Sequence, residues 1–399
     1  MKKIFYLFFL TCVPYIAYAS TAYTWASQSG AGLRTWSSVT SSADGSKLAA
    51  GVYGGYIYTS NDGGLTWLAR TGLGITYTST ITSSSDGTKL VVAGNTGIYT
   101  STDWGANWVF RTNMRTTSNG RDIAISDDGM KLAAIVQIGL YFWLYTSTDG
   151  GATWNARIVV NQVGPCCASS GATVQTSSNG NIIAVAGDVL YLSADGGLTW
   201  SSHTPPAGYA QGDLGMSADG MKLAWLGNPY FADYIYTSID GGITWTQRTS
   251  GVNYWSIIVV SGDGSRIIAE TNDERIFISV DGGVSWINIS TPVAPATASG
   301  QLTLASSFDG SKLITSYSNG YIWTGVSQNC THPLNQTLDG GGFDFFLGAV
   351  NQLINRFGFN FCISNASTRH YFIPAKTILE LQSFYNAVPR LEGVSTSTP

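Results

Sequence analysis

The hydrophobic residues of this chain occur in short runs that alternate with polar residues, and turn sequences rich in Gly and Asp separate the runs. Lys89-Leu90-Val91-Val92, for example, is soon followed by Ile98-Tyr99-Thr100. Alternation with a period of two is typical of β-strands, and D-G between two apolar runs favours a tight hairpin turn, because glycine accepts a positive φ. The pattern therefore predicts an all-β protein built of short strands.

One turn sequence, which we call the D-G-G turn, recurs six times and reads TSTDGGATW in its most regular copy. A Ser or Thr precedes it and a Trp closes it. Its aspartates are Asp62, Asp103, Asp149, Asp195, Asp240 and Asp281, at spacings of 41, 46, 46, 45 and 41 residues. The closing tryptophans are Trp67, Trp108, Trp154, Trp200, Trp245 and Trp286.

A second turn sequence, which we call the D-G turn, alternates with the first and reads SADGSKLAA in its first copy. Its seven copies are centred on Asp44, Asp86, Asp128, Asn179, Asp219, Asp263 and Asp309. Each unit therefore reads strand, D-G turn, strand, loop, strand, D-G-G turn, strand. Four strands in 41–46 residues are typical of one propeller blade, so the seven copies predict a seven-bladed β-propeller.

The last unit lacks a D-G-G turn and a fourth strand, because the pattern changes at Cys330. Tyr23-Thr24-Trp25 lies outside every unit, and Trp25 precedes Asp44 by 19 residues, as Trp67 precedes Asp86. We predict that this segment pairs beside Tyr321–Trp323 as the outer strand of blade seven. Loop closure over this length costs roughly 5 kcal/mol. Burial of a Trp and a few neighbours, at about 1.5–3 kcal/mol each, offsets that cost, and closure removes an exposed sheet edge.

The D-G-G turn resembles the Asp-box, or BNR, repeat of β-propeller proteins, S-x-D-x-G-x-T-W. The third copy matches at every position: Ser147, Asp149, Gly151, Thr153 and Trp154. The second copy departs from it at Trp104 and Asn107. The resemblance covers about residues 21–327 and implies a structural turn. Its even spacing is similar to photosystem II assembly factors and generic secreted Asp-box propellers, which act as docking surfaces.

The repeated aspartates are predicted to be structural, because an Asp in a turn accepts backbone N–H groups, and six equivalent carboxylates on a ring cannot meet at one substrate. We therefore predict no catalytic residue, cofactor or metal site. The alternative is a glycoside hydrolase, sialidase-like or endo-glucanase-like, with paired carboxylates. The sialidase Phe/Tyr-Arg-Ile/Leu-Pro motif is lacking. The acids of the propeller outside the turns are Asp122, Asp127, Asp188, Asp213, Asp233, Asp273, Glu270 and Glu274.

Insertions are concentrated in the loops opposite the two turns, where we expect a ligand, since loops on a rigid scaffold carry function. The candidate ligand-binding residues are Trp36, Tyr141, Phe142, Trp143, Tyr230, Phe231, Asp233, Tyr254 and Trp255. Such aromatic residues stack on sugar rings or grip peptides, and the alternative is that they cap the core between blades. Three residues after the closing Trp stand Arg70, Arg111, Arg157, His203 and Arg248, either a cationic band for an acidic partner or isolated solvated side chains.

Residues 1–19 read as a signal peptide: Lys2 and Lys3 precede an apolar run too short to span a bilayer, and Ala17-Tyr18-Ala19 fits a cleavage site. Without it, 18 basic and 24 acidic residues give a net charge of −6, which argues against nucleic acid. The chain is expected to be secreted, monomeric and not inserted in a membrane. Residues 20–328 would form the propeller.

Residues 329–399 are predicted to form a small helical segment with a disordered end, because Phe346, Val350, Leu353 and Phe357 recur at helical spacing. A disulfide between Cys330 and Cys362 would close its start, whereas the partners of Cys166 and Cys167 stay open. Glycosylation sequons occur at Asn288, Asn329, Asn335 and Asn365. We thus expect a secreted, non-catalytic propeller that binds a glycan or a protein.

Overall fold

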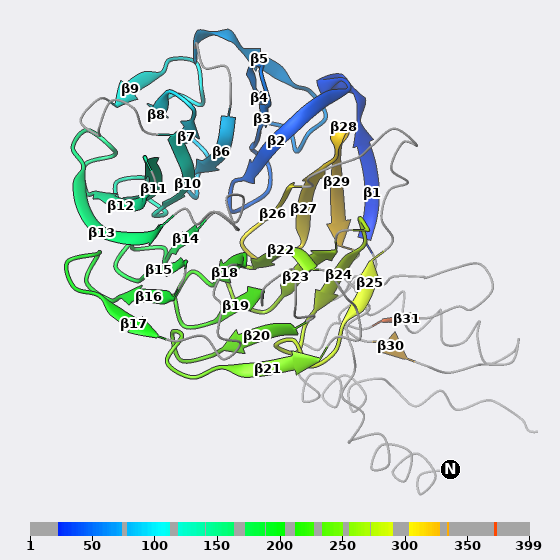
Figure 1. Cartoon of the computed structure of the whole chain (residues 1–399). Coiled ribbons are helices and arrows are strands. Elements are labelled where there is room, and N and C mark those ends of the chain that lie inside the picture. The colour runs from blue at the N-terminus through cyan, green and yellow to red at the C-terminus, as the bar shows by residue number, and fades with distance from the viewer. Residues whose placement is uncertain are drawn as a thin grey trace, which may run out of the picture. The chain divides into compact units, whose positions relative to one another are not determined.

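The computed structural model describes residues 23–73, 78–111, 119–139, 141–162, 172–187, 189–203, 212–226, 234–249, 255–271, 273–289 and 303–327, together with residues 333–334 and 371–372. The chain divides into two compact units, Ala22–Ser327 and a second unit formed by both ends of the chain. The first unit is an all-β, seven-bladed propeller of four-stranded antiparallel blades (Figure 1).

The blades follow one another along the chain, and each runs from an inner strand to an outer strand. Blade 1 contains β2 (Arg34–Ser41), β3 (Leu48–Val52), β4 (Ile57–Ser60) and β5 (Leu68–Arg70). Blade 2 contains β6 (Thr78–Ser83), β7 (Leu90–Gly94), β8 (Gly97–Ser101) and β9 (Val109–Arg111). Blade 3 contains β10 (Asn119–Ile125), β11 (Leu132–Ile138), β12 (Tyr141–Ser147) and β13 (Asn155–Gln162).

The next three blades repeat this order. Blade 4 contains β14 (Thr173–Thr176), β15 (Ile183–Ala186), β16 (Leu190–Ser193) and β17 (Ser201–His203). Blade 5 contains β18 (Leu214–Met216), β19 (Leu223–Leu226), β20 (Tyr234–Ser238) and β21 (Thr246–Thr249). Blade 6 contains β22 (Trp255–Val260), β23 (Ile267–Thr271), β24 (Ile276–Ser279) and β25 (Ile287–Ile289). Two 3-10 turns, η1 (Ser29–Ala31) and η2 (Thr71–Leu73), precede blades 1 and 2.

The second and third strands of a blade are buried on both faces, because each blade stacks against two neighbours. All five residues of β3 and of β7 are buried, which explains why these strands read as continuous apolar runs. Seven hydrophobic clusters lie between successive blades, one for each of the seven interfaces. The hydrophobic core is therefore divided into seven parts, one at each interface between blades.

The seventh sheet has the order β1-β29-β27-β26 and combines both ends of the propeller sequence. It contains β26 (Thr303–Ser306), β27 (Lys312–Ser316), β29 (Ile322–Ser327) and β1 (Tyr23–Gln28). Strand β1 lies beside β29 and pairs with it antiparallel (Figure 1). Tyr23-Thr24-Trp25 lies opposite residues 325–327 rather than opposite Tyr321–Trp323 as predicted, and Gln28 lies opposite Ile322. In blade 1, Arg70 lies opposite Ile57 in the same register, so Gln28 occupies the position of Arg70.

A further strand, β28 (Ser318–Gly320), joins the last blade to the first by pairing with β2. The buried indole of Trp36 donates from Nε1 to the Gly320 carbonyl at 3.0 Å. The Thr35 hydroxyl also hydrogen-bonds Asn319 Oδ1. These contacts bind the inner strand of blade 1 to blade 7 independently of β1.

In the second unit, the structure describes only the paired strands β30 (Pro333–Leu334) and β31 (Tyr371–Phe372). The predicted signal peptide, the helical segments, the Cys330–Cys362 disulfide, and Cys166 and Cys167 lie outside the described residues and stay predictions. Within the described part of the chain, no helix has the length and apolar character needed to cross a bilayer.

Candidate functional site

Each D-G-G turn is a closed network of hydrogen bonds around its aspartate. In blade 3, Asp149 Oδ1 accepts from the Ser147 hydroxyl and from the Thr153 N–H, both at 2.8 Å, and Oδ2 accepts from the Thr153 hydroxyl at 2.6 Å. The Ser147 hydroxyl accepts the Gly151 N–H, and the Trp154 indole donates to the Gly151 carbonyl. The side chains of Ser147, Asp149, Thr153 and Trp154 therefore all find partners within the turn, which supports a structural role.

The irregular second copy keeps this geometry with different atoms. Asn107 replaces the Thr, and its side-chain amide donates to Asp103 Oδ2 at 2.6 Å while its N–H donates to Oδ1. Trp104 replaces the first Gly and adopts φ 58°, a left-handed conformation that costs a non-glycine residue energy. The aspartate network thus tolerates the substitution of its neighbours.

The second glycine of the turn is needed for the contact between blades. A Cβ on Gly151 would lie 3.0 Å from Thr100 Cγ2 of the preceding blade, and its φ is +86°. Between blades 7 and 1, Gly64 faces Thr324 at 3.1 Å in the same way. Gln28 of β1 donates to Thr324 Oγ1 at 2.6 Å there, as Arg111 donates to Thr100 Oγ1 in blade 2.

Replacement of Asp149 by Ala is expected to destabilise the propeller by about 1–3 kcal/mol, because it leaves the donors of Ser147 and Thr153 without their charged acceptor. Urea unfolding measures the change. The conservative Asp149→Asn variant should lose less, since its amide oxygen still accepts the Thr153 N–H. An unchanged midpoint for Asp149→Ala would contradict the structural role.

The pH dependence of stability offers a second check on these turns. Hydrogen bonds from the Thr side chain and N–H lower the pKa of Asp62, Asp149 and Asp240 to about 2. A carboxyl whose folded pKa is lowered stabilises the fold above its unfolded pKa, and that stability is lost as pH falls. The midpoint of chemical unfolding should therefore fall from about pH 4 toward pH 2, and a flat profile there would contradict these networks.

The D-G turns form a continuous ring of backbone hydrogen bonds around the propeller axis. In most blades, the residue directly before the turn Asp or Asn donates its backbone N–H to the carbonyl of the equivalent residue in the next blade. In blade 6, the turn aspartate itself, Asp263, is the donor. The acceptors in blade order are Ser85, Asp127, Ser178, Ala218, Gly262, Phe308 and Ala43, at 2.7–3.1 Å. The bond from Phe308 to Ala43 joins the last blade to the first.

A basic side chain three residues after the turn aspartate reaches the turn of the next blade, a feature that the sequence analysis missed. Lys47 Nζ donates to the Asp86 carbonyl at 2.8 Å, and Lys312 Nζ donates to the Asp44 carbonyl at 2.7 Å across the blade 7–blade 1 interface. Ile182 holds this position in blade 4. Lys or Arg recurs three residues after the turn aspartate in the sequence, and this recurrence could have predicted the contact.

The ring of D-G turns surrounds one end of a cavity of about 290 Å³ on the propeller axis. Hydroxyl groups line it on blades 7, 1 and 2, where Ser306, Thr40 and Thr82 lie. Apolar side chains, including Met216 and Val260, line it on blades 5 and 6. The cavity therefore has a polar wall and an apolar wall, and the described part of its lining contains no Lys or Arg.

Four polar side chains in the lining have hydrogen-bonding capacity that no described residue uses. They are Thr82 on β6, Asp127 before the D-G turn of blade 3, Gln175 on β14 and Ser306 on β26. Asp127 contributes its backbone to the ring, so its carboxylate is free for a ligand. A concave site with apolar walls and a few converging polar groups is typical of small-molecule binding. This cavity is the candidate binding site in the described part of the propeller.

Two of the acids considered for catalysis, Asp122 on β10 and Asp213 directly before β18, are half-buried at equivalent positions of their blades. Asp122 Oδ2 accepts the Val174 N–H of the next blade at 2.8 Å, and Asp213 Oδ2 accepts the Ile258 N–H at 2.9 Å. Burial, with a smaller effect of Asp122, raises the pKa of Asp213 to about 7. Each carboxyl therefore joins its blade to a backbone N–H of the inner strand of the following blade.

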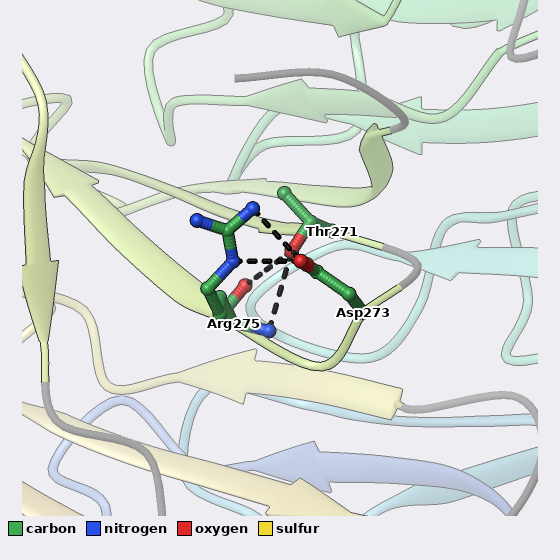
Figure 2. A network of polar contacts seen from close by, with 3 residues as sticks. All are labelled: Thr271, Asp273 and Arg275. Atoms are coloured by element: carbon green, nitrogen blue, oxygen red, sulfur yellow. Dashed lines mark hydrogen bonds and ion pairs between the residues drawn. The ribbon is translucent and has the colours of Figure 1, made fainter.

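The remaining described acids outside the turns have no paired arrangement around the cavity. Asp273 accepts from the Thr271 hydroxyl and from Arg275 Nε at 2.9 Å, and forms a salt bridge with Arg275 at 2.8 Å (Figure 2). Glu270 is fully buried, and Glu274 lies in the same turn as Asp273. Asp188 and Asp233 lie outside the described residues.

The predicted ligand-binding residues lie in different environments. Trp36 and Trp255 are 2% and 3% exposed and pack in the clusters beside blades 1 and 6, which fits the core-packing alternative. Phe142 is buried and Trp143 half-buried, whereas Tyr141 is exposed. Tyr230, Phe231, Asp233 and Tyr254 lie outside the described residues, so the prediction of a loop-face ligand site stays a prediction.

The arginines after the closing Trp are held within their own blades. The Nε atoms of Arg70, Arg157 and Arg248 donate to the hydroxyls of Thr59, Thr146 and Thr237 on the neighbouring strand, at 2.6–2.9 Å. In blade 4, His203 contacts the Ser201 hydroxyl at 3.0 Å. These contacts explain the recurrence of the residues without an acidic partner.

Among the described residues, no group of three or more His, Cys, Asp and Glu side chains is placed to hold a metal ion. No protein-family model matches the chain, and no curated protein matches it either. The fold itself and the cavity on its axis therefore carry the functional argument.

Proposed function

We propose that this chain is a secreted, non-catalytic binding propeller of the Asp-box type, and that its ligand is a glycan held in the axial cavity. The observation that carries the proposal is the set of four uncommitted polar side chains, Thr82, Asp127, Gln175 and Ser306, facing one cavity from four blades. Secretion rests on the signal-peptide pattern of residues 1–19.

A sugar fits this lining better than an anionic ligand does. Hydroxyl groups of a sugar ring donate to a carboxylate and exchange hydrogen bonds with Thr, Ser and Gln side chains, whereas the C–H face of the ring packs on apolar residues. The cavity offers the first kind of group on Thr82 and Ser306 and the second kind on Met216 and Val260. An anionic ligand would lack a basic partner in the lining.

The competing function is a glycoside hydrolase. Two carboxyl groups must then face each other across one substrate, about 5–10 Å apart. Asp127 is the only acid among the described lining residues. Asp213 accepts the Ile258 N–H, Asp273 is bound to Arg275, and Glu270 is buried. These placements favour binding without turnover.

Glycan-array screening of the purified chain tests the proposal, followed by calorimetry on the best ligand. Asp127→Asn and Gln175→Ala should each weaken binding by about tenfold, roughly 1.4 kcal/mol, because the first replaces a charged acceptor by a weaker neutral one and the second removes a hydrogen bond. Asp273→Asn, which changes an acid that does not line the cavity and is bound to Arg275, is the matched control and should bind normally.

Two results would contradict the proposal. Binding that survives both Asp127→Asn and Gln175→Ala would place the ligand elsewhere, such as on the loop face. Release of sugar from the bound glycan, abolished by neutralisation of Asp213, Asp273, Asp233 or Glu270, would establish the hydrolase instead.

We also propose that β1 closes the ring. Tyr23 packs into the cluster between blades 6 and 7, and its hydroxyl donates to the Gly310 carbonyl and accepts from Arg266 at 3.0 Å. The hydrogen-bonded side chains of Gln28 and Thr324 pack against Gly64 of blade 1. One strand thus contacts the sixth, seventh and first blades.

A further inference from the structure

Glu270 on β23 has no part in the proposed binding function. It is 0% exposed, and neither of its carboxyl oxygens has a hydrogen-bond partner among the described residues. In the other blades, the equivalent residue of the second strand is Gly51, Ala93, Ile135, Ala186, Leu226 or Ser316. Blade 6 alone places a carboxyl group at this position, so the fold does not require one there.

The side chain of Glu270 points into the interface between blades 6 and 7. Residues two apart on a strand share a face, so Glu270 lies on the same face as Ile268. Ile268 packs with Leu313 of β27 in the cluster between these blades. The carboxyl group is therefore enclosed between two stacked sheets.

Strand β27 contributes unpartnered oxygen to the same interface. Thr315 lies two residues after Leu313 and so shares its face. It is 0% exposed, and its Oγ1 has no hydrogen-bond partner among the described residues. Tyr317, a further two residues on, is 1% exposed, and Glu270 helps to raise its pKa, which places the two groups near each other.

A second carboxyl group, that of Glu274, lies nearer the surface. Glu274, half-buried in the turn after β23, acts electrostatically on Glu270 and raises its pKa further above the value set by burial. Arg275, the adjacent cation, is bound to Asp273 (Figure 2). Among the described residues, no salt bridge involves Glu270 or Glu274.

Two neighbouring carboxyl groups and a free hydroxyl without a cation are expensive to bury, since an uncompensated internal charge costs several kcal/mol. All the donors are oxygens, which hard cations prefer, and two carboxylates balance a divalent charge. The irregular donor set suits Ca²⁺ better than Mg²⁺, which demands octahedral geometry. We propose that the interface between blades 6 and 7 binds Ca²⁺ through Glu270, Glu274 and Thr315.

Sequence analysis predicted no metal site, because the two glutamates form no recognisable ligand motif and Thr315 lies 41 residues after Glu274. The site becomes visible only when the two blades are stacked. Its occupation would tie blade 7 to blade 6 and so would strengthen the ring at the blade that contains both ends of the propeller sequence.

Thermal unfolding with EDTA and with increasing Ca²⁺ tests the proposal. The wild-type midpoint should rise with Ca²⁺, by about 5 °C at a hundredfold excess over the dissociation constant. Glu270→Gln should abolish the rise and also the luminescence of Tb³⁺ used as a Ca²⁺ substitute. Asp273→Asn, which removes an exposed acid from the same turn, is the matched control and should retain both.

A wild-type midpoint that is independent of Ca²⁺ would overturn the proposal, as would a Glu270→Gln variant with an undiminished Ca²⁺ response. If acidification raises the midpoint and Ca²⁺ does not, the site holds a proton rather than a cation. Calorimetric titration of the folded variants with Ca²⁺ keeps the result independent of any change in their basal stability.

Discussion

Replacing Tyr23 and Trp25 together by Ala is expected to destabilise the propeller by about 4–6 kcal/mol, because large aromatic residues cost roughly 3–5 kcal/mol each when buried and less when half-buried. Tyr23 is 7% exposed, and Trp25 packs at the edge of the same cluster. The substitutions also remove the Tyr23 bonds to Gly310 and Arg266. Urea unfolding measures the loss.

The variant should self-associate as well, because release of β1 exposes β29 as an unpaired edge strand. Sedimentation analysis would detect this. Val326→Ala is the matched control: Val326 lies on β29 opposite Thr24 but is 49% exposed, so its loss should cost little. If the double variant unfolds at the wild-type midpoint and stays monomeric, β1 does not hold the ring.

In EDTA, Glu270→Gln is expected to stabilise the protein at neutral pH by roughly 1–3 kcal/mol, because the fold must keep this carboxyl protonated or bury its charge without hydrogen-bond donors, whereas the unfolded chain ionises it freely. Burial, with a contribution from Glu274, holds the pKa of Glu270 well above its usual range. The gain should be largest in alkaline solution and should vanish in acid, where the wild-type carboxyl is protonated.

The slope of stability against pH distinguishes this effect from better packing. A carboxyl with a raised folded pKa stabilises the fold below its unfolded pKa near 4.5, and that stability is lost as pH rises toward the folded pKa, at about 1.4 kcal/mol per pH unit. Asp213 adds a similar decline up to about pH 7. Glu270→Gln should remove its own part of the slope, and an unchanged slope would contradict an ionising Glu270.

Together with the acid-sensitive turn aspartates, these groups predict a stability maximum in mildly acidic solution. Below about pH 4 the networks of Asp62 and Asp149 are lost. Above about pH 4 the carboxyls of Glu270 and Asp213 ionise in the unfolded chain while the fold keeps them protonated, so stability declines.

The blade number could be predicted from sequence because the turns depend on local chemistry. The D-G-G network is closed by a Ser, an Asp, a Gly and a Thr within seven residues, as the contacts of Asp149 show. The all-β class and the four-stranded antiparallel blades follow from the same repeats and are confirmed. The helical tail and the exported location stay predictions.

The axial site was harder to predict because its residues come from different blades and converge only when the ring is assembled. Thr82, Gln175 and Ser306 are ordinary strand residues along the chain and meet at the axis only in the ring. Asp122 and Asp213 each lie six residues before the aspartate of a D-G turn. Alignment of the repeats therefore shows that the two residues are equivalent. Glu270 has no such counterpart, so no repeat pattern predicts it.

The pairing of β1 with β29 is tested most directly by an engineered disulfide between Thr24→Cys and Val326→Cys, which lie opposite each other in the two strands. Oxidation of the folded monomer, followed by peptide mapping, should yield this cross-link in nearly every molecule. The shifted pair Thr24→Cys and Thr324→Cys, whose register differs by two residues, should not form. Failure of the first pair, or equal cross-linking of the second, would contradict the closure of blade 7 by the N-terminal strand.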